Sequence, residues 1–199
     1  MIVLLGTTNP DKLREMRRLL DELPIEFRPL TTYPTITEAE ETGTTYSENA
    51  RLKGLHYARQ TGLPTIAEDS GFEVDVLDRE PGVVSARFLG ATATYPQRFD
   101  EIYRRVRARG ATGSTARFVC ALVLATPEGI RFETRQTVEG DLAPEPRGSK
   151  GFGYDPIFLY PPFGKTLGEV EEIEKSNVSH RGKAVRAVRE FLRQYLGRT

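Results

Sequence analysis

Segments with the hydrophobic spacing of helices and of strands alternate along the first half of the chain. Leu13, Met16 and Leu20 recur on one helical face, and the apolar run 2–5 before them is typical of a buried strand. Later, two long strand-like runs flank residues 127–129, which predicts a hairpin. This order predicts an α/β fold with a mixed sheet. The predicted strands are 2–5, 25–27, 65–67, 115–126, 130–140 and 157–159, and the predicted helices are 10–23, 47–61, 95–106 and 179–196.

Composition narrows the classes of function. The 199 residues suffice for one domain with a substantial core. Because 28 basic and 28 acidic residues balance, binding to nucleic acid or to an anionic membrane is not expected. The lone Cys120 lies in an apolar run and permits no internal disulfide, as in a reducing compartment. No apolar run approaches the length of about 20 residues that spans a bilayer. With no signal peptide recognised either, a cytoplasmic protein is expected.

Two adjacent acids, Glu68 and Asp69, follow the predicted strand 65–67. The Ser-Gly pair after them predicts a turn, so that two carboxylates reach the edge of the sheet. Together with Glu41 they can converge on Mg²⁺, which prefers oxygen ligands shared with substrate phosphates. A carboxylate beside such a metal can also deprotonate a water molecule. Solvated turn acids are the alternative, and Ser70 can either bind a phosphate or cap the turn.

The loop before the first predicted helix offers a phosphate site through Thr7, Thr8, Asn9 and Lys12. A helix N-terminus presents backbone N–H groups and the positive end of its dipole, and a lysine in the first turn adds a full charge. The glycine-rich Walker pattern is missing from this segment. An ordinary capped helix with a solvated lysine explains the same residues.

Residues 151–155, with the sequence GFGYD, suit the recognition of a base. Glycines allow the backbone to approach a ligand closely, and Phe152 or Tyr154 can stack on a base. Asp155 can accept a hydrogen bond from a ring N–H of a purine. Aromatic side chains that plug the end of a core are the alternative.

Lys175, His180 and Arg181 lie near the predicted start of the last helix. The forked donors of Arg181 suit a phosphate or a carbonyl on a base, although an exposed helix start explains the same residues. His56, in contrast, falls inside a predicted helix and is expected to be structural. Four segments thus suit the same ligand, a nucleoside triphosphate.

In this order, the motifs resemble the inosine triphosphate pyrophosphatase family, whose members hydrolyse non-standard purine nucleoside triphosphates. The resemblance covers nearly the whole chain. The matching segments are Thr8-Asn9 with Lys12 and Glu15, Glu41-Thr42-Gly43, Glu48-Asn49-Ala50 with Lys53, Glu68-Asp69-Ser70-Gly71, Pro81-Gly82-Val83-Val84-Ser85-Ala86-Arg87, Gly151-Phe152-Gly153-Tyr154-Asp155-Pro156, Glu174-Lys175 and Ser179-His180-Arg181.

The resemblance implies a fold and an activity. The fold is an elongated mixed α/β sheet with flanking helices, in a single domain over 1–199 with two lobes around a central substrate cleft. The activity is Mg²⁺-dependent hydrolysis of XTP, ITP or dITP to the nucleoside monophosphate and pyrophosphate, by a homodimer. Two alternatives are a related phosphohydrolase with another base preference and a non-catalytic nucleotide-binding module. Balanced charge and the acids at these junctions count against the second.

Position by position, the resemblance makes Asp69 the general base and, with Glu41, a magnesium ligand. Family members often carry Asp-Asp in this motif, whereas this chain has Glu68 before Asp69, which keeps the charge and changes its reach. The residues implied in phosphate binding are Thr7, Thr8, Asn9, Lys12 and Lys53. Those implied in nucleotide binding are Ser70, Phe152, Gly153, Tyr154, Asp155, Lys175, His180 and Arg181.

Overall fold

The computed structural model describes residues 1–196, which form helices on both sides of a mixed sheet. The helices are α1 (Pro10–Leu20), α2 (Tyr46–Thr61), α3 (Tyr95–Ala108), α4 (Glu172–Val178) and α5 (His180–Leu196). The strands are β1 (Ile2–Leu5), β2 (Glu26–Pro29), β3 (Thr65–Val74), β4 (Thr115–Thr126), β5 (Gly129–Leu142), β6 (Phe158–Tyr160) and β7 (Lys165–Thr166). The predicted α/β class is therefore confirmed.

In the described part of the chain, the strands form one seven-stranded sheet in the order β2-β1-β3-β4-β5-β6-β7. Strand β1 runs parallel to β2 and to β3, whereas β6 runs antiparallel to β5 and to β7. The predicted hairpin is confirmed, because β4 and β5 are neighbours joined at Pro127 and Glu128. Helices α1 and α2 cross over between parallel strands, as such connections require.

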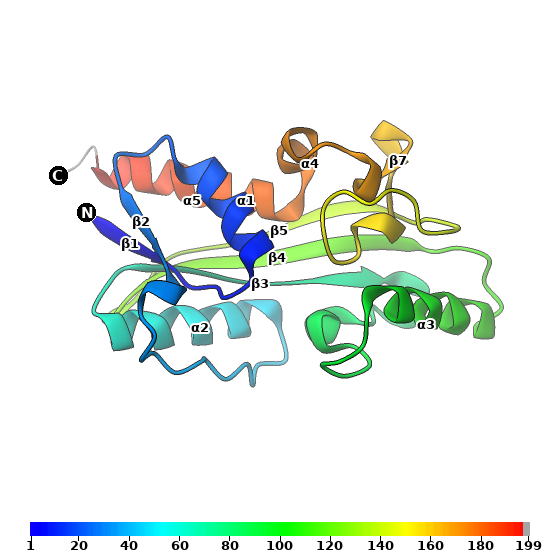
Figure 1. The fold of residues 1–199 in the computed structure, drawn as a ribbon, viewed down its shortest axis with the longest axis horizontal. Helices are drawn as coiled ribbons and strands as arrows, with labels where there is room; N and C mark the ends of the chain where they lie inside the picture. The colour runs from blue at the N-terminus through cyan, green and yellow to red at the C-terminus, as the bar shows by residue number, and fades with distance from the viewer. Residues whose placement is uncertain (197–199) are drawn as a thin grey trace. The chain divides into compact units, whose positions relative to one another are not determined.

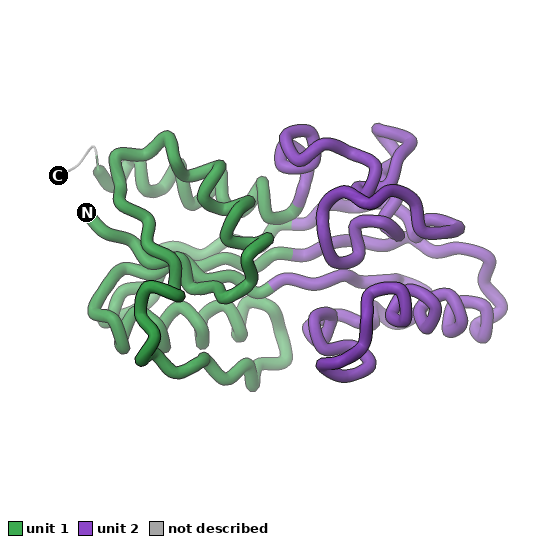
Figure 2. Tube along the Cα trace, viewed as in Figure 1, with its two compact units in different colours: residues 1–69, 120–136, 180–199 green, residues 70–119, 137–179 purple. Residues whose placement is uncertain are grey.

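The chain divides into two compact units (Figure 2). Unit 1 comprises residues 1–69, 120–136 and 180–199, and unit 2 comprises 70–119 and 137–179. Strands β3, β4 and β5 each contribute residues to both units. Each unit therefore draws its part of the sheet from the same long strands and adds helices of its own.

Unit 1 has helices on both faces of its part of the sheet (Figure 1). Helices α1 and α5 cover one face, where Met16 and Val188 are fully buried in a core with Ile66 of β3. Helix α2 covers the other face, where Tyr57 packs with Leu4 of β1. Strands β1 and β3 are thus buried on both faces, which explains the apolar runs that predicted them.

Unit 2 has an aromatic core of its own. Phe72 of β3 lies within 5.1 Å of the ring centroids of both Phe118 and Tyr154, and Phe158 packs edge-on against it. Ile102 of α3 joins the same buried cluster. The predicted helix 95–106 is confirmed as α3, whereas the short helix α4 was not predicted.

Helix α2 shows how local signals set element ends. Thr45 and Glu48 form a capping box at its start, so that the predicted opening residue Ser47 lies inside the helix instead. The helix ends at the predicted boundary after residue 61, where Gly62 has a φ of 70° that favours glycine.

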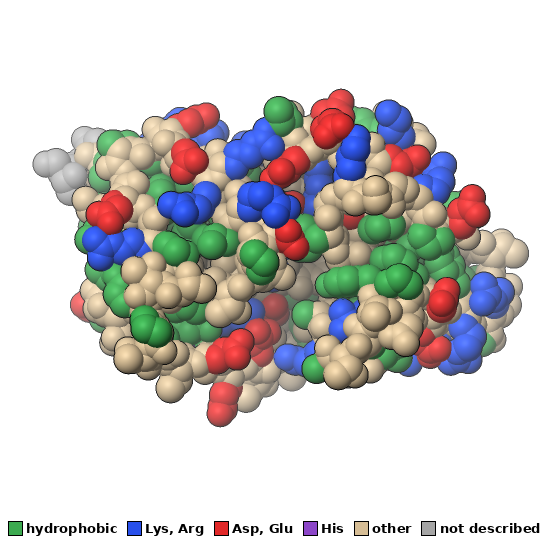
Figure 3. All heavy atoms as spheres, in the orientation of Figure 1, with side chains coloured by type: hydrophobic (Ala, Val, Ile, Leu, Met, Phe, Trp, Pro, Cys, Tyr) green, Lys and Arg blue, Asp and Glu red, His purple; other side chains and the backbone are tan. Residues whose placement is uncertain are grey.

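No helix within residues 1–196 combines the length and apolar character needed to cross a membrane. On the face drawn in Figure 3, acidic and basic side chains are interspersed rather than gathered by sign. This mixture fits the balance of 28 basic and 28 acidic residues in the sequence.

Candidate active site

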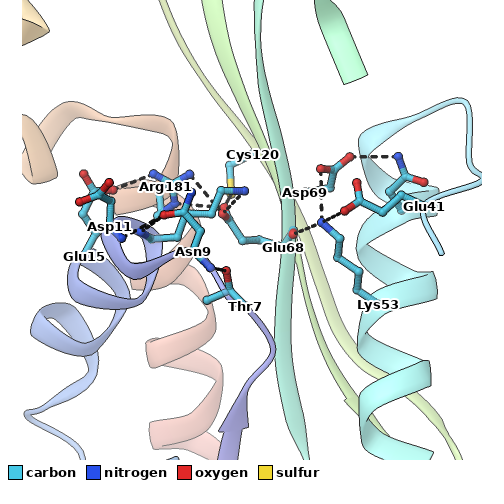
Figure 4. Close-up of polar contacts among 12 residues, drawn as sticks. Thr7, Asn9, Asp11, Glu15, Glu41, Lys53, Glu68, Asp69, Cys120 and Arg181 are labelled. Carbon is cyan, nitrogen blue, oxygen red and sulfur yellow. Dashed lines mark hydrogen bonds and ion pairs between the residues drawn. The ribbon is translucent and has the colours of Figure 1, made fainter. Parts of the chain in front are cut away.

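Glu68 and Asp69 point to opposite faces of β3 (Figure 4). Neighbouring residues in a strand alternate between faces, and both side chains are buried, with residue exposures of 2% and 4%. The predicted turn is wrong, because β3 continues from Thr65 to Val74 through both acids. Basic side chains on the two faces compensate the buried carboxylates, so that the strand can continue where local preference favours a turn.

On the α2 face, Asp69 and Glu41 share the ammonium group of Lys53 (Figure 4). Lys53 Nζ lies 2.7 Å from Oε1 of Glu41 and 3.6 Å from Oδ1 of Asp69. Asn49 donates its side-chain amide to Oδ2 of Asp69 at 3.1 Å. Two carboxylates from distant parts of the sequence therefore face one positive charge. These residues are called the Asp69 site below.

The oxygen donors of the Asp69 site fit a hard divalent cation. Mg²⁺ commonly binds one or two carboxylates and takes its other ligands from water and substrate phosphates. Glu41 and Asp69 provide such a pair, and Lys53 shows that the space between them accepts positive charge. Among residues 1–196, no group of three or more His, Cys, Asp and Glu side chains gathers to hold a metal by itself. The role of the pair as magnesium ligands stays a prediction.

Burial raises the pKa of Asp69, and the charges of Lys53 and Lys12 offset only part of that effect. For Lys53, burial favours the neutral form, but Asp69 and Glu41 outweigh burial and raise its pKa. An aspartate with a raised pKa accepts a proton more readily than an ordinary one, which suits a general base.

On the opposite face, Glu68 is the centre of a buried ion cluster. Its Oε1 lies 2.9 Å from Nζ of Lys12 and 3.1 Å from Nη2 of Arg181. The thiol of Cys120 donates to Oε2 at 2.8 Å, and Arg181 also contacts Glu15 at 2.7 Å. Burial alone would raise the pKa of Glu68, but Arg181 and Lys12 hold it well below its ordinary value. These five residues are called the Glu68 ion cluster below.

The predicted phosphate loop caps the start of α1 and contacts the Glu68 ion cluster through Lys12. Asn9 caps α1, because its Oδ1 accepts from the N–H groups of Asp11 and Lys12 at 2.9 and 3.1 Å. Thr7 Oγ1 accepts from the N–H of Asn9 at 3.2 Å, while Thr8 is exposed. The alternative of a capped helix with a solvated lysine is right about the cap. It is wrong about Lys12, whose ammonium group contacts the buried Glu68. Phosphate binding by this loop stays a prediction.

In unit 2, the structure brings Phe152, Asp155 and Lys175 together. Lys175 Nζ lies 2.5 Å from Oδ2 of Asp155 and 4.6 Å from the ring centroid of Phe152. The N–H of Phe152 donates to the same carboxylate oxygen at 2.8 Å. Gly151 has a φ of 71°, and a Cβ there would overlap Asp155, so this turn requires glycine.

Tyr154 lies apart from this group in the core of unit 2. Its ring stacks on Phe72, and its hydroxyl donates to the carbonyl of Ser85 at 2.8 Å. This placement matches the core-packing alternative for Tyr154. Ser70 belongs to β3, and Gly153 adopts a φ of 67° in the turn before Asp155.

His180 and Arg181 begin α5 in unit 1 and are both buried, so the alternative of an exposed helix start is wrong. Sequence reasoning assigned no role to Asn49 or Glu15, although both stood in the matched motifs. The spacing of Asn49 four residues before Lys53 is a signal for a shared helical face. Nothing local indicates the contact of Glu15 with Arg181, which lies 166 positions away.

Known proteins resemble this chain over nearly its whole length. A dITP/XTP pyrophosphatase of an Exiguobacterium species is 46% identical over 189 residues, which cover 94% of each chain. One from Thermus thermophilus is 45% identical, over 96% of this chain and 91% of its own. The solved structure of a HAM1 protein from Coxiella burnetii superposes with a TM-score of 0.89 at 38% identity, covering 98% of this chain and 99% of its own. The sequence profile of the Ham1 family matches residues 3–191, and the chain belongs to that family.

Proposed function

We propose that the protein hydrolyses dITP, XTP and ITP to the nucleoside monophosphate and pyrophosphate. The names of its relatives, dITP/XTP pyrophosphatases, support this class of substrate. The geometric observation that carries the proposal is the pairing of Glu41 and Asp69 around the ammonium group of Lys53. This arrangement suits a cation beside a polyphosphate, with a buried carboxylate at hand to accept a proton.

In the proposed reaction, Asp69 accepts a proton from a water molecule whose oxygen attacks phosphorus. The bond between the α- and β-phosphates breaks, and pyrophosphate and the monophosphate leave. Mg²⁺, held by Glu41 and Asp69 when bound, supplies neutralisation of the phosphate charge. Lys12 and Lys53 add positive charge, which stabilises charge that develops on the phosphate oxygens.

Selection of the base is assigned to Phe152, Asp155 and Lys175. The ring of Phe152 offers a stacking surface, and Lys175 is a donor for the six-position oxygen of inosine or xanthine. Adenine carries an amino group at that position, which is a hydrogen-bond donor. The buried ammonium group of Lys175 would then face a second donor and make no hydrogen bond with it. Polar mismatches of this kind discriminate strongly between substrates.

A substrate panel tests the proposal. Pyrophosphate release is measured from dITP, XTP and ITP against ATP, GTP and a pyrimidine triphosphate, with Mg²⁺ and with EDTA. We expect Mg²⁺-dependent release that favours the first three. Preference for a pyrimidine nucleotide would support the alternative phosphohydrolase, and tight nucleotide binding without any turnover would support the non-catalytic module.

Three further expectations belong to the proposal and are supported by family resemblance. They are a requirement for Mg²⁺, a homodimer and a place in the cytoplasm, where the nucleotide pool lies. Light scattering coupled to gel filtration tests the dimer, since the mass should be twice the 22.3 kDa of one chain.

A further inference from the structure

Asn49 is a fully buried polar residue in the first turns of α2, with 0% exposure. Its side-chain NH₂ group donates to Oδ2 of Asp69 at 3.1 Å. Its side-chain oxygen accepts from the N–H of Gly43 at 2.8 Å. Only this orientation of the amide satisfies both contacts, because the flipped form would set oxygen against carboxylate and N–H against N–H. The two ends of one side chain therefore connect two segments of the Asp69 site.

Gly43 allows this connection because the loop approaches α2 very closely. A Cβ at Gly43 would lie 2.6 Å from Cβ of Glu48 and 2.7 Å from Oδ1 of Asn49. Gly43 follows Glu41 by two positions, so a bond that holds Gly43 also restricts where the Glu41 carboxylate can lie. The contact with Asn49 thus ties the loop that carries Glu41 to the strand that carries Asp69.

Asn49 and Lys53 lie four residues apart on one face of α2 and contact different oxygens of the same carboxylate. Asn49 binds Oδ2 of Asp69, whereas Lys53 is closest to Oδ1. A neutral donor can keep its bond when a divalent cation approaches, while the ammonium group of Lys53 is repelled by that cation. Asn49 is therefore suited to hold Asp69 in one orientation throughout the reaction.

From this geometry we propose that Asn49 is a positioning residue that holds Asp69 and the Glu41 loop in register for the cation. The inference rests on the proposed function and extends it to a residue outside the predicted ligands. Groups that orient ligating carboxylates typically change metal affinity or activity by about 10–100-fold when they are removed.

The test compares Asn49→Leu and Asn49→Ser with Gln60→Leu. Gln60 is an exposed amide on the same helix that donates to Thr37 Oγ1 at 3.0 Å and so contacts the same loop away from Asp69. Three quantities are measured: Mn²⁺ affinity by calorimetry without nucleotide, kcat and KM for dITP, and the melting temperature.

We expect both Asn49 variants to bind Mn²⁺ about 10-fold more weakly and to lose at least about 10-fold in kcat, with a much smaller change in KM. Gln60→Leu should match the wild type in both. Wild-type Mn²⁺ affinity and kcat in either folded Asn49 variant would overturn the inference. So would unfolding of both variants at the assay temperature, because that result identifies a structural role. A wild-type protein without Mg²⁺-dependent dITP turnover would instead refute the proposed function, and the Mn²⁺ titration would still decide the role of Asn49.

Discussion

Replacing Glu68 with glutamine tests whether the Glu68 ion cluster stabilises the fold. The substitution removes a buried charge that lies 2.9 Å from Lys12 and 3.1 Å from Arg181. Removal of one partner from a buried ion pair costs about 3–5 kcal/mol, because the remaining charge is left uncompensated. In a chain of this size each kcal/mol lowers the melting temperature by about 2–4 °C, so we expect a fall of roughly 10 °C in Glu68→Gln.

Glu22→Gln is the matched control. Glu22 accepts from Arg189 at 3.0 Å and from Arg193 at 2.9 Å, but its side chain is 62% exposed. Exposed pairs contribute about 0–1 kcal/mol, so this variant should melt within a few degrees of the wild type. Thermal unfolding followed by circular dichroism measures both variants. Equal melting temperatures for the two variants would refute the reasoning.

The pH dependence of the same comparison provides a second check. Because folding holds the pKa of Glu68 well below its ordinary value, the unfolded chain takes up this proton first as the pH falls. The stabilisation by Glu68 is therefore complete above its unfolded pKa of about 4.3 and is lost as the pH falls through the folded value. The difference in unfolding free energy between wild type and Glu68→Gln should stay constant near neutral pH and narrow below about pH 4. A difference that widens in acid would contradict the assignment.

Two other substitutions have definite expected outcomes. Asp69→Asn should abolish dITP turnover. It should also raise the melting temperature at neutral pH, because burial raises the pKa of Asp69 and its negative charge therefore costs stability. This gain in melting temperature should disappear below about pH 3.9, where the carboxyl is protonated in both the folded and the unfolded chain. Retained turnover would exclude Asp69 as the base. Gly54→Ala should destabilise, because its Cβ would lie 2.6 Å from Cγ2 of Val123. Overpacking costs about 1–3 kcal/mol against a gain in helix propensity of about 1 kcal/mol. An unchanged urea midpoint would contradict this expectation.

Elements with local signals could be predicted from the sequence. Asn9 and Pro10 are a local cap, and α1 begins where they place it. The turn at Pro127 and Glu128 joins β4 to β5 as expected. The continuation of β3 through Glu68 and Asp69 could not be predicted, since acids, serine and glycine disfavour strands. Tertiary contacts override that preference here, and they come from residues far away in the sequence.

In the candidate site, too, residue types could be read from the sequence, whereas long-range contacts could not. The residue types at Glu41 and Asp69 indicated a metal pair, and the structure brings both to Lys53. The place of Glu68 at the centre of an ion cluster was not predictable, because its contact with Arg181 joins positions 113 residues apart. Sequence alone also cannot tell which of two adjacent acids faces which helix, since a shift of one residue in register exchanges them.

The pKa values of the two acids of β3, Glu68 and Asp69, are shifted in opposite directions, and this difference favours different chemical roles for them. Glu68 is held ionised by Arg181 and Lys12, so it is a poor proton acceptor and a strong anchor for cations. Asp69 has a raised pKa on the other face, next to Lys53, and is the better base. Adjacent titratable groups whose environments separate their pKa values commonly hold different roles in catalysis. The alternation of side chains along one strand therefore lets a single dipeptide contact Lys12 on one face and place Asp69, the proposed base, on the other.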